Sequence, residues 1–267
     1  MKYTEFKPNE ILTEYIQLIW IAESESTTDN YPKEKILPDG IVEIVFHFAD
    51  PFMTFNTQGK KKKQSKGFAI SQMKKFVEIE SDGTIGFISV RLYPWGANHF
   101  FDTPISSFLD NSIDIELLWP NDFRNILQAI QDVDNNKRVN IIQSFLEEQL
   151  KKHKKRTKEI ETAIKIIRES KGKYTIEDLC NKLHIHHKKL ERGFVNTIGT
   201  TPKVFSRTTR FLHLCHHLAE YENLTMTQLA HKIGYYDQAH FIKDFKAFSG
   251  ITPKEYFQQN NICFAEF

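Results

Sequence analysis

The order of apolar and polar positions divides the chain into a first part with strand-like patterns and a second part with helical ones. Runs rich in β-branched and aromatic residues, such as 17–24 and 41–48, recur through the first hundred residues. Turn sequences rich in glycine, proline and aspartate separate these runs at Leu37–Gly40, Ser81–Gly83 and Pro94–Gly96. The pattern predicts a small β-barrel or β-sandwich.

Two polar stretches of the first part have simple structural interpretations. The pair Asp39-Gly40 is typical of a hairpin turn, so we expect Asp39 to be a turn residue and not a catalytic acid. The lysine-rich segment Gly59–Gly67 fits a long exposed loop between two strands. Solvation of that loop accounts for its charges, with nonspecific contact to DNA as the alternative.

From Pro104 onward the apolar period becomes helical. One apolar stripe at three- and four-residue spacing consists of Val139, Ile142, Phe145, Leu146 and Leu150. The basic segment Lys151–Glu159 follows it and is the predicted domain boundary. We therefore predict three parts: a β-rich sensor domain (1–103), a helical linker or dimerisation segment (104–156) and a helical C-terminal domain (157–260).

The C-terminal domain contains an internal repeat with an offset of 50 to 51 residues. Segment 175–180 aligns with segment 225–230, and each begins with a threonine followed three residues later by Asp178 or Gln228, as in a capping box. A short turn and a second helix follow in each copy, which ends in a glycine and, two residues later, a Thr-Pro pair. A long helix over 205–220 joins the two copies.

Each copy matches a helix–turn–helix unit, whose second helix needs one apolar and one polar face. In the second copy Phe241, Phe245 and Phe248 recur at helical spacing and form the apolar face. We expect them to pack on the preceding helix, where the small side chain of Ala230 permits a close approach. The polar face of the second helix then points outward.

The polar faces of the two second helices carry side chains suited to reading DNA. Glutamine can bond adenine with two hydrogen bonds, lysine suits guanine or phosphate, and alanine or isoleucine suits the thymine methyl group. The predicted DNA-binding residues are Lys188, Glu191 and Arg192 in the first copy and Gln238, Ala239, His240, Ile242, Lys243 and Lys246 in the second. Of these, we expect Gln238 at a base edge and Lys246 on a phosphate.

Charge is distributed unevenly along the chain. Residues 1–150 carry 15 basic and 22 acidic residues, a net charge of −7, whereas residues 151–267 carry 21 and 12, a net charge of +9. Nine of the eleven histidines also lie in the second part. The basic half is suited to a polyanion and the acidic half is not.

The stretch LAHKIGYYDQAHFIKDFKAFSGITPKEY closely resembles the DNA-binding signature of AraC/XylS-type transcriptional regulators. The matching residues are Ala230, Gly234, Tyr235, His240, Phe241, Phe245, Lys246, Gly250, Pro253 and Tyr256. The resemblance begins near Lys158 and is looser in the first copy, where His186 and His187 replace a Ser-Pro-like entry. It implies binding to double-stranded DNA without a cofactor, with Ala230, Gly234, Phe241 and Phe245 as the structural core of the second unit.

The first part is similar to an uncharacterised β-rich domain found ahead of such DNA-binding modules. The stretches that carry this similarity are LPDGIVEIVFHF (37–48) and ISVRLYPWGANHFFDTPISSF (88–108). The resemblance implies no particular ligand for this domain.

A metal-dependent sensor or enzyme domain with accessory DNA binding is the alternative interpretation. His213 and His217 are four residues apart on a helix and could share a metal, and Glu43 and His47 share a strand face that His99 could join. The sequence has no glycine-rich phosphate loop and no nucleophile elbow, so it predicts no catalytic residues. Exposed helix histidines without a metal are the simpler interpretation.

Together these patterns predict an α+β protein: an N-terminal β-rich, barrel or cupin-like domain, then an all-α domain with two tandem helix–turn–helix units. Without a membrane-length apolar run or a secretory signal, and with cysteines only at Cys180, Cys215 and Cys263, we expect a cytoplasmic, bacterial-type transcription factor. Its expected partners are double-stranded DNA, a small-molecule effector at the N-terminal domain, a second copy in a homodimer and, for an activator, RNA polymerase.

Overall fold

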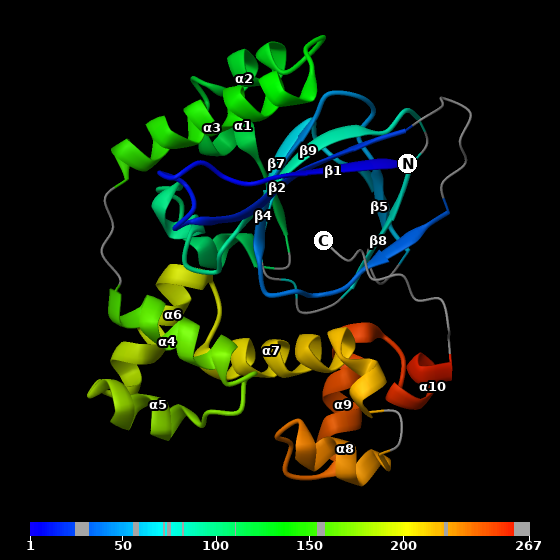
Figure 1. Cartoon of the computed structure of the whole chain (residues 1–267), viewed down its shortest axis with the longest axis vertical. Helices are drawn as coiled ribbons and strands as arrows, with labels where there is room; N and C mark the ends of the chain where they lie inside the picture. The colour runs from blue at the N-terminus through cyan, green and yellow to red at the C-terminus, as the bar shows by residue number, and fades with distance from the viewer. Residues whose placement is uncertain are drawn as a thin grey trace.

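The computed structural model describes residues 1–24, 32–55, 59–71, 73, 76–81, 83–109, 111–153, 158–221 and 224–258. It has the predicted α+β architecture, with β-strands and covering helices followed by a helical C-terminal domain (Figure 1). In Figure 1 the strands lie above helix α7 (Pro202–His216), which joins the two parts of the helical domain.

The larger sheet contains six antiparallel strands in the described part of the chain, in the order β1-β2-β9-β4-β7-β10. Its strands are β1 (Lys2–Phe6), β2 (Ile16–Glu23), β4 (Val42–His47), β7 (Gly67–Ile70), β9 (Gly86–Leu92) and β10 (Ser112–Asp114). The central strands β4 and β9 are buried almost throughout, because their two faces are both covered.

The smaller sheet has the order β3-β8-β5-β6, with strands β3 (Glu34–Ile36), β5 (Met53–Phe55), β6 (Lys61–Lys63) and β8 (Val77–Glu80). Two predictions are wrong here. Part of the predicted lysine-rich loop forms edge strand β6, whose exposed lysines are compatible with an unpaired sheet edge. The turn at Asp39-Gly40 joins β3 to β4 in different sheets, so it is not a hairpin turn.

Helices that follow β9 in the chain cover one face of the larger sheet. They are η1 (Ala97–His99), η2 (Ile105–Phe108), α1 (Ile115–Leu118), α2 (Phe123–Ala129) and α3 (Asn135–Lys152). The apolar stripe predicted for α3 is confirmed: four of its residues are buried in one core with the strands, and Leu150 packs at its edge. The helical segment 104–156 therefore shares its core with the sheet, and its role in dimerisation stays a prediction. Residues 154–157, within the predicted domain boundary, lie outside the described residues.

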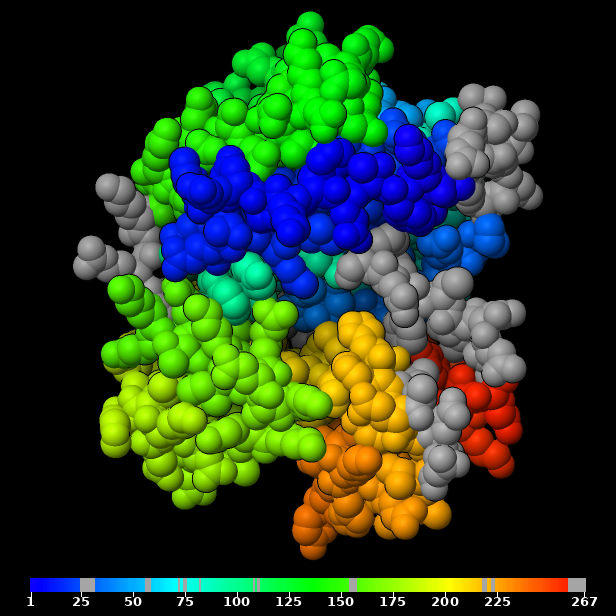
Figure 2. All heavy atoms as spheres, in the orientation of Figure 1, coloured from blue at the N-terminus to red at the C-terminus, as the bar shows by residue number. Residues whose placement is uncertain are grey.

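The C-terminal domain consists of α4 (Lys158–Glu169), α5 (Ile176–Leu183), α6 (His187–Ile198), α7, η3 (Leu218–Tyr221), α8 (Met226–Lys232), α9 (Gln238–Ser249) and α10 (Pro253–Gln258). Figure 2 shows two lobes, one formed by α4 and α5 and the other by α8, with a notch between them. The joining helix ends at His216, earlier than predicted, because the chain turns there into η3. No helix among the described residues is long and apolar enough to cross a membrane.

The N-terminal domain contacts both lobes. The C-terminal end of α6 lies against η1 and η2, and a Cβ added to Gly199 would lie 2.8 Å from the carbonyl oxygen of Ile105. Trp95 belongs to the apolar cluster of the first lobe, and Leu37 belongs to that of the second. The position of the β-strands is therefore coupled to both helix–turn–helix units.

Candidate functional site

The two predicted repeats fold into two capped helix–turn–helix units. Thr175 and Thr225 each accept a hydrogen bond from the backbone N–H three residues on, and Gln228 completes a capping box by accepting from the Thr225 N–H. The shorter Asp178 instead accepts the Thr175 hydroxyl at 2.6 Å. Each second helix ends at a glycine in the left-handed region, at a φ of +78° or +81°. Both ends of each unit are thus fixed by local sequence.

The residues predicted as the core of the second unit are buried, apart from Gly234 in the turn. Phe241, Phe245 and Phe248 are buried in one apolar cluster with Leu229, Ala230 and Ile233. Ala230 is fully buried, as a close helix crossing requires. Gly234 has a φ of +91°, which a glycine adopts without strain, so it can form the tight turn before α9.

The outward face of α9 matches the prediction at most positions. Ala239, His240, Lys243 and Lys246 are exposed. Gln238 is half-buried, and its carbonyl oxygen accepts a hydrogen bond of 2.8 Å from the Thr227 hydroxyl. This bond orients the Gln238 amide at the start of the helix.

Ile242 does not point wholly outward as predicted. It is half-buried and packs against the apolar cluster of the second unit. The physical reason is its place beside the buried Phe241 and Phe245 on a helix whose apolar stripe is wide.

In the first unit, too, the residues predicted to face outward are exposed and those predicted to face inward are buried. Lys188, Glu191 and Arg192 on α6 are exposed, while Leu190 and Phe194 are fully buried. The three exposed residues lie in the N-terminal half of α6, away from the end that contacts η2. This exposed half contains the positions that helix–turn–helix proteins use to read bases.

An ion pair that the sequence pattern did not reveal ties α9 to α7. Asp244 is 3% exposed and accepts two hydrogen bonds from Arg207, at 2.7 and 2.5 Å. The ring of His240 lies 3.6 Å from the same carboxylate. The sequence does hint that Asp244 has a cationic partner, although it does not say which one. Asp244 stands between Phe241 and Phe245 on the buried stripe, where an unpaired charge would be costly.

A second arginine of α7 holds the turn before α9. Arg210 donates to the carbonyl oxygen of Gly234 at 2.6 Å, and its guanidinium lies 4.8 Å from the centre of the buried Tyr235 ring. Together with the Arg207 ion pair, this contact fixes the orientation of α9 relative to α7.

A large cavity of about 1040 Å³ lies between the β-strands and α7. Its walls include strands of both sheets, with apolar side chains such as Trp20, Phe68 and Phe87. The remaining wall comes from the C-terminal domain and includes Arg168 and several residues of α7, of which Phe205 is one. The cavity is therefore bounded by both domains.

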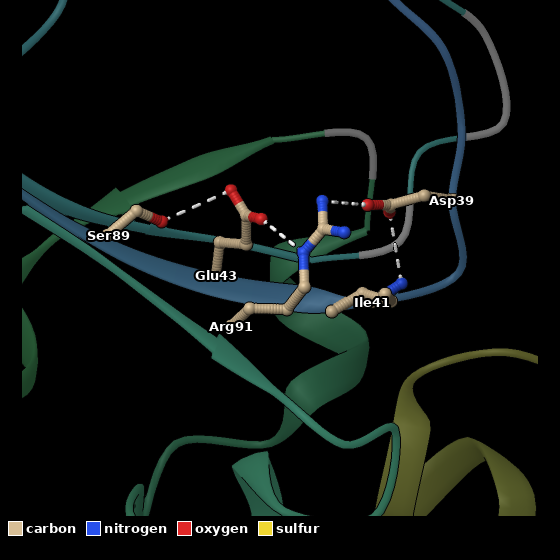
Figure 3. A network of polar contacts seen from close by, with 5 residues as sticks. All are labelled: Asp39, Ile41, Glu43, Ser89 and Arg91. Carbon is tan, nitrogen blue, oxygen red and sulfur yellow. Dashed lines mark hydrogen bonds and ion pairs between the residues drawn. The ribbon is translucent and has the colours of Figure 1, made fainter. Parts of the chain in front are cut away.

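Arg91 forms a charged network in the cavity wall (Figure 3). Its Nε donates to Glu43 at 2.7 Å and its guanidinium also donates to Asp39 at 3.1 Å. Burial acts to lower the pKa of Arg91, but Glu43 and Asp39 together raise it above its ordinary value. Burial raises the pKa of the Asp39 carboxyl, to about 6, despite its contact with Arg91.

The residues considered for a metal site in the β-domain do not converge. Glu43 binds Arg91, while His47 is fully buried in the cavity wall with its Nε2 3.0 Å from the side-chain oxygen of Gln64. His99 lies elsewhere, next to Glu161 of α4. Among the described residues, no three histidine, cysteine, aspartate or glutamate side chains are placed to hold a metal ion.

The histidines of α7 form a local contact instead. The rings of His213 and His217 lie 4.3 Å apart, and His213 Nε2 is 3.1 Å from the hydroxyl of Tyr221. Burial lowers the pKa of His213 to about 4. Cys215, also on α7, is buried and its pKa is raised by burial, so it is an inert core thiol.

Comparison with protein families agrees with this geometry. A helix-turn-helix domain family model matches residues 179–259, which contain α6 and α9. The C-terminal domain is an AraC-type helix–turn–helix domain. A second model, described as a domain of unknown function (DUF6597), matches residues 4–114 and so covers the β-strands ahead of the AraC-type domain. DNA binding and transcription regulation are the functions that these matches support.

Individual proteins are similar to parts or all of the chain to different degrees. Over 86 residues the chain is 34% identical to the uncharacterized HTH-type transcriptional regulator YisR of Bacillus subtilis, a match that spans 32% of this chain and 30% of YisR. The structure of ToxT from Vibrio cholerae aligns over 90% of this chain and 99% of its own, with 10% identity and a TM-score of 0.47. The C-terminal domain of AraT from Geobacillus stearothermophilus aligns over 39% of this chain and 88% of its own, with 22% identity and a TM-score of 0.35.

Proposed function

We propose that this protein is a transcriptional regulator that reads two adjacent major-groove segments of duplex DNA. The observation that carries the proposal is the pair of capped units joined by α7, each with exposed cationic side chains on its second helix. Arg192 on α6 and Gln238 on α9 are suited to base edges, and Lys246 to a phosphate. A regulator of chromosomal DNA acts in the bacterial cytoplasm.

Charge supplies the sequence-independent part of this binding. The net charge of +9 over residues 151–267 attracts the phosphate backbone, and each phosphate contact releases counterions. The logarithm of the affinity of the full-length protein for duplex DNA is therefore expected to fall linearly with the logarithm of salt concentration. Titration by fluorescence anisotropy at several salt concentrations measures this slope, and a salt-independent interaction would contradict the proposal.

The distance between the two reading helices determines the layout of the DNA site. Two reading helices on one rigid connector enter successive major grooves on one face of the duplex, about 34 Å apart. A single molecule then protects an asymmetric site with two short determinants, one helical turn apart. Selection of bound genomic fragments identifies the site, and footprinting measures its extent. A compact site with one determinant would mean that only one unit reads DNA.

The interdomain cavity is the place for a small-molecule effector. Its volume, about 1040 Å³, is sufficient for a small organic molecule, and its apolar walls with a few convergent polar groups are typical of ligand sites. An effector there would contact the β-strands and α7 together, and so would act on the element that orients both reading helices. Homodimer formation through segment 104–156, and contact with RNA polymerase in the case of an activator, complete the proposal.

A further inference from the structure

The second helix–turn–helix unit has one residue more than the first in the turn between its two helices. In each turn the N–H of a buried residue, Ile185 or Tyr235, donates to a carbonyl of the preceding helix, at 3.1 or 2.9 Å. These two residues are 50 positions apart, whereas the N-cap residues of the second helices, His186 and Asp237, are 51 positions apart. The additional residue of the second turn is therefore Tyr236.

Tyr236 does not take part in the packing of its unit. Its neighbours are both engaged: Tyr235 is buried in the apolar cluster, and the Asp237 carboxylate accepts from the N–H of His240 at 2.7 Å. Tyr236 itself is 89% exposed, more than any other large apolar or aromatic residue in the part of the chain that the structure describes. Its ring and hydroxyl are thus open to a partner outside the chain.

Positive side chains border the same turn. A Cβ added to Gly234 would lie 3.4 Å from the side chain of Lys173 and 3.6 Å from that of Arg210. Lys173 is exposed and comes from the loop before α5, in the first unit, whereas Arg210 lies on α7. In Figure 1 the turn between α8 and α9 lies on the side of α8 that faces α5. The surroundings of Tyr236 therefore favour an anionic partner.

The position of Tyr236 relative to α9 indicates which part of DNA it meets. Gln238 is the first residue of α9, and the first residues of a reading helix contact base edges. Tyr236 comes two residues earlier and outside the helix, so it lies toward the rim of the groove, where the sugar–phosphate backbone runs. Tyrosine side chains are among the usual partners of phosphate oxygens in protein–DNA complexes.

We propose that Tyr236 is a further DNA contact, whose hydroxyl donates a hydrogen bond to a phosphate at the rim of the major groove that α9 enters. The contact sets the register of α9 on the duplex and reads no base. Because the tyrosine is uncharged, its contact releases no counterion, in contrast to that of Lys246. The first unit has no residue at this position. This contact rests on the proposed function, and the two are tested by different outcomes.

Tyr236→Phe removes the hydroxyl and keeps the ring. Its affinity for the selected DNA and for scrambled DNA should fall by the same factor, about three- to tenfold, with an unchanged salt slope. Tyr3→Phe, at an exposed tyrosine of β1, is the matched control and should bind as the wild type does. Anisotropy titrations over a salt series measure both quantities. Full affinity in Tyr236→Phe, or a loss confined to the selected DNA, would overturn the proposal.

Ethylation interference locates the phosphate. An ethyl group on the contacted phosphate should weaken binding of the wild type and should have no effect on Tyr236→Phe, which has already lost that contact. The phosphate should flank the determinant at which Gln238→Ala relaxes base preference. The same interference pattern in the wild type and in Tyr236→Phe would overturn the proposal.

Folding is checked separately. Because Tyr236 is exposed, Tyr236→Phe should unfold at the same urea concentration as the wild type. A lower midpoint would assign the hydroxyl a structural role and overturn the proposal. Absence of DNA binding by the wild type would refute the proposed function. Equal binding by the wild type and Tyr236→Phe would refute only the Tyr236 contact and leave the proposed function standing.

Discussion

The two helix–turn–helix units share one local design but differ in how they are held. Each has a threonine cap, a buried phenylalanine-containing helix and a left-handed glycine at its end. The second unit is tied to α7 by the Arg207–Asp244 ion pair and by Arg210. The first unit has its reading helix packed against η1 and η2 of the N-terminal domain.

The two kinds of contact have different consequences: one fixes the orientation of α9 on α7, and the other links α6 to the N-terminal domain. A charged, directional contact fixes the angle between α7 and the second reading helix, because a bidentate arginine–carboxylate pair has one favourable geometry. Apolar packing and a close backbone approach at Gly199 hold the first reading helix against the N-terminal domain. A movement of the N-terminal domain is therefore expected to reach the first unit through η1 and η2, and the second unit through Leu37 and α7.

The largest expected effect comes from removing the core of one unit. Phe241→Ala should destabilise the second unit by about 3–5 kcal/mol, because a buried phenylalanine is replaced by a cavity. Phe194→Ala is the matched change in the first unit, where the N-terminal domain adds support. Urea denaturation followed by circular dichroism measures both. Identical unfolding of wild type and Phe241→Ala would show that the inward face of α9 is misassigned.

The second largest effect is expected from a substitution that breaks the Arg207–Asp244 ion pair. Asp244→Ala should cost about 3 kcal/mol, at the low end for breaking a buried pair, because Arg207 retains 28% side-chain exposure. A double-mutant cycle with Arg207→Ala isolates the coupling between the two residues. Lys243→Ala, an exposed change one residue away, is the control and should leave the unfolding midpoint unchanged. A coupling energy near zero would remove the proposed difference between the units.

Base reading by each unit gives the third effect. Gln238→Ala and Arg192→Ala should each weaken binding to the selected site by about 1–3 kcal/mol and relax preference at one base position. The two positions should lie in different determinants of the site. Competition binding against scrambled DNA measures both quantities, with the exposed change Asn181→Ala on α5 as control. Loss at the same base position for both variants would contradict a two-unit reading.

A phosphate contact should behave differently from a base contact. Lys246→Ala is expected to weaken binding evenly across sequences and to reduce the salt slope by about one unit, because one fewer counterion is released. Anisotropy titrations on the selected and scrambled DNA over a salt series measure the change. A loss confined to the selected sequence would instead assign Lys246 to base reading.

The smallest effect concerns α7, which both units share. Burial, with Lys171 and His217 nearby, lowers the pKa of His213 to about 4, so the unfolded chain binds a proton more readily than the folded one below about pH 6.5. Stability should therefore fall as pH decreases from about 6.5 toward 4, and His213→Gln should flatten this dependence. Urea midpoints at several pH values measure it, with the exposed His231→Gln as control. An equal slope in His213→Gln would exclude His213 as the source.

Local patterns in the sequence determined the helix–turn–helix units almost completely. Threonine caps, apolar residues at i, i+3 and i+4, and terminal glycines act within one or two turns of helix, so neighbouring residues are enough to predict them. The exposed faces of α6 and α9 followed from the same period, with Ile242 as the exception. The β-rich character of the first part followed from its composition, and the stripe on α3 from its spacing.

Only the tertiary structure decided how distant segments meet. The Asp39 turn looked like a local hairpin, yet it joins two sheets and lies on α7, which is about 165 positions away in the sequence. Arg207 and Asp244 are 37 residues apart, and no local period relates them. The cavity exists because two sheets and α7 enclose it together. Pairing between remote charges depends on the geometry of the assembled chain, since Coulomb attraction and burial act through space and not along the sequence.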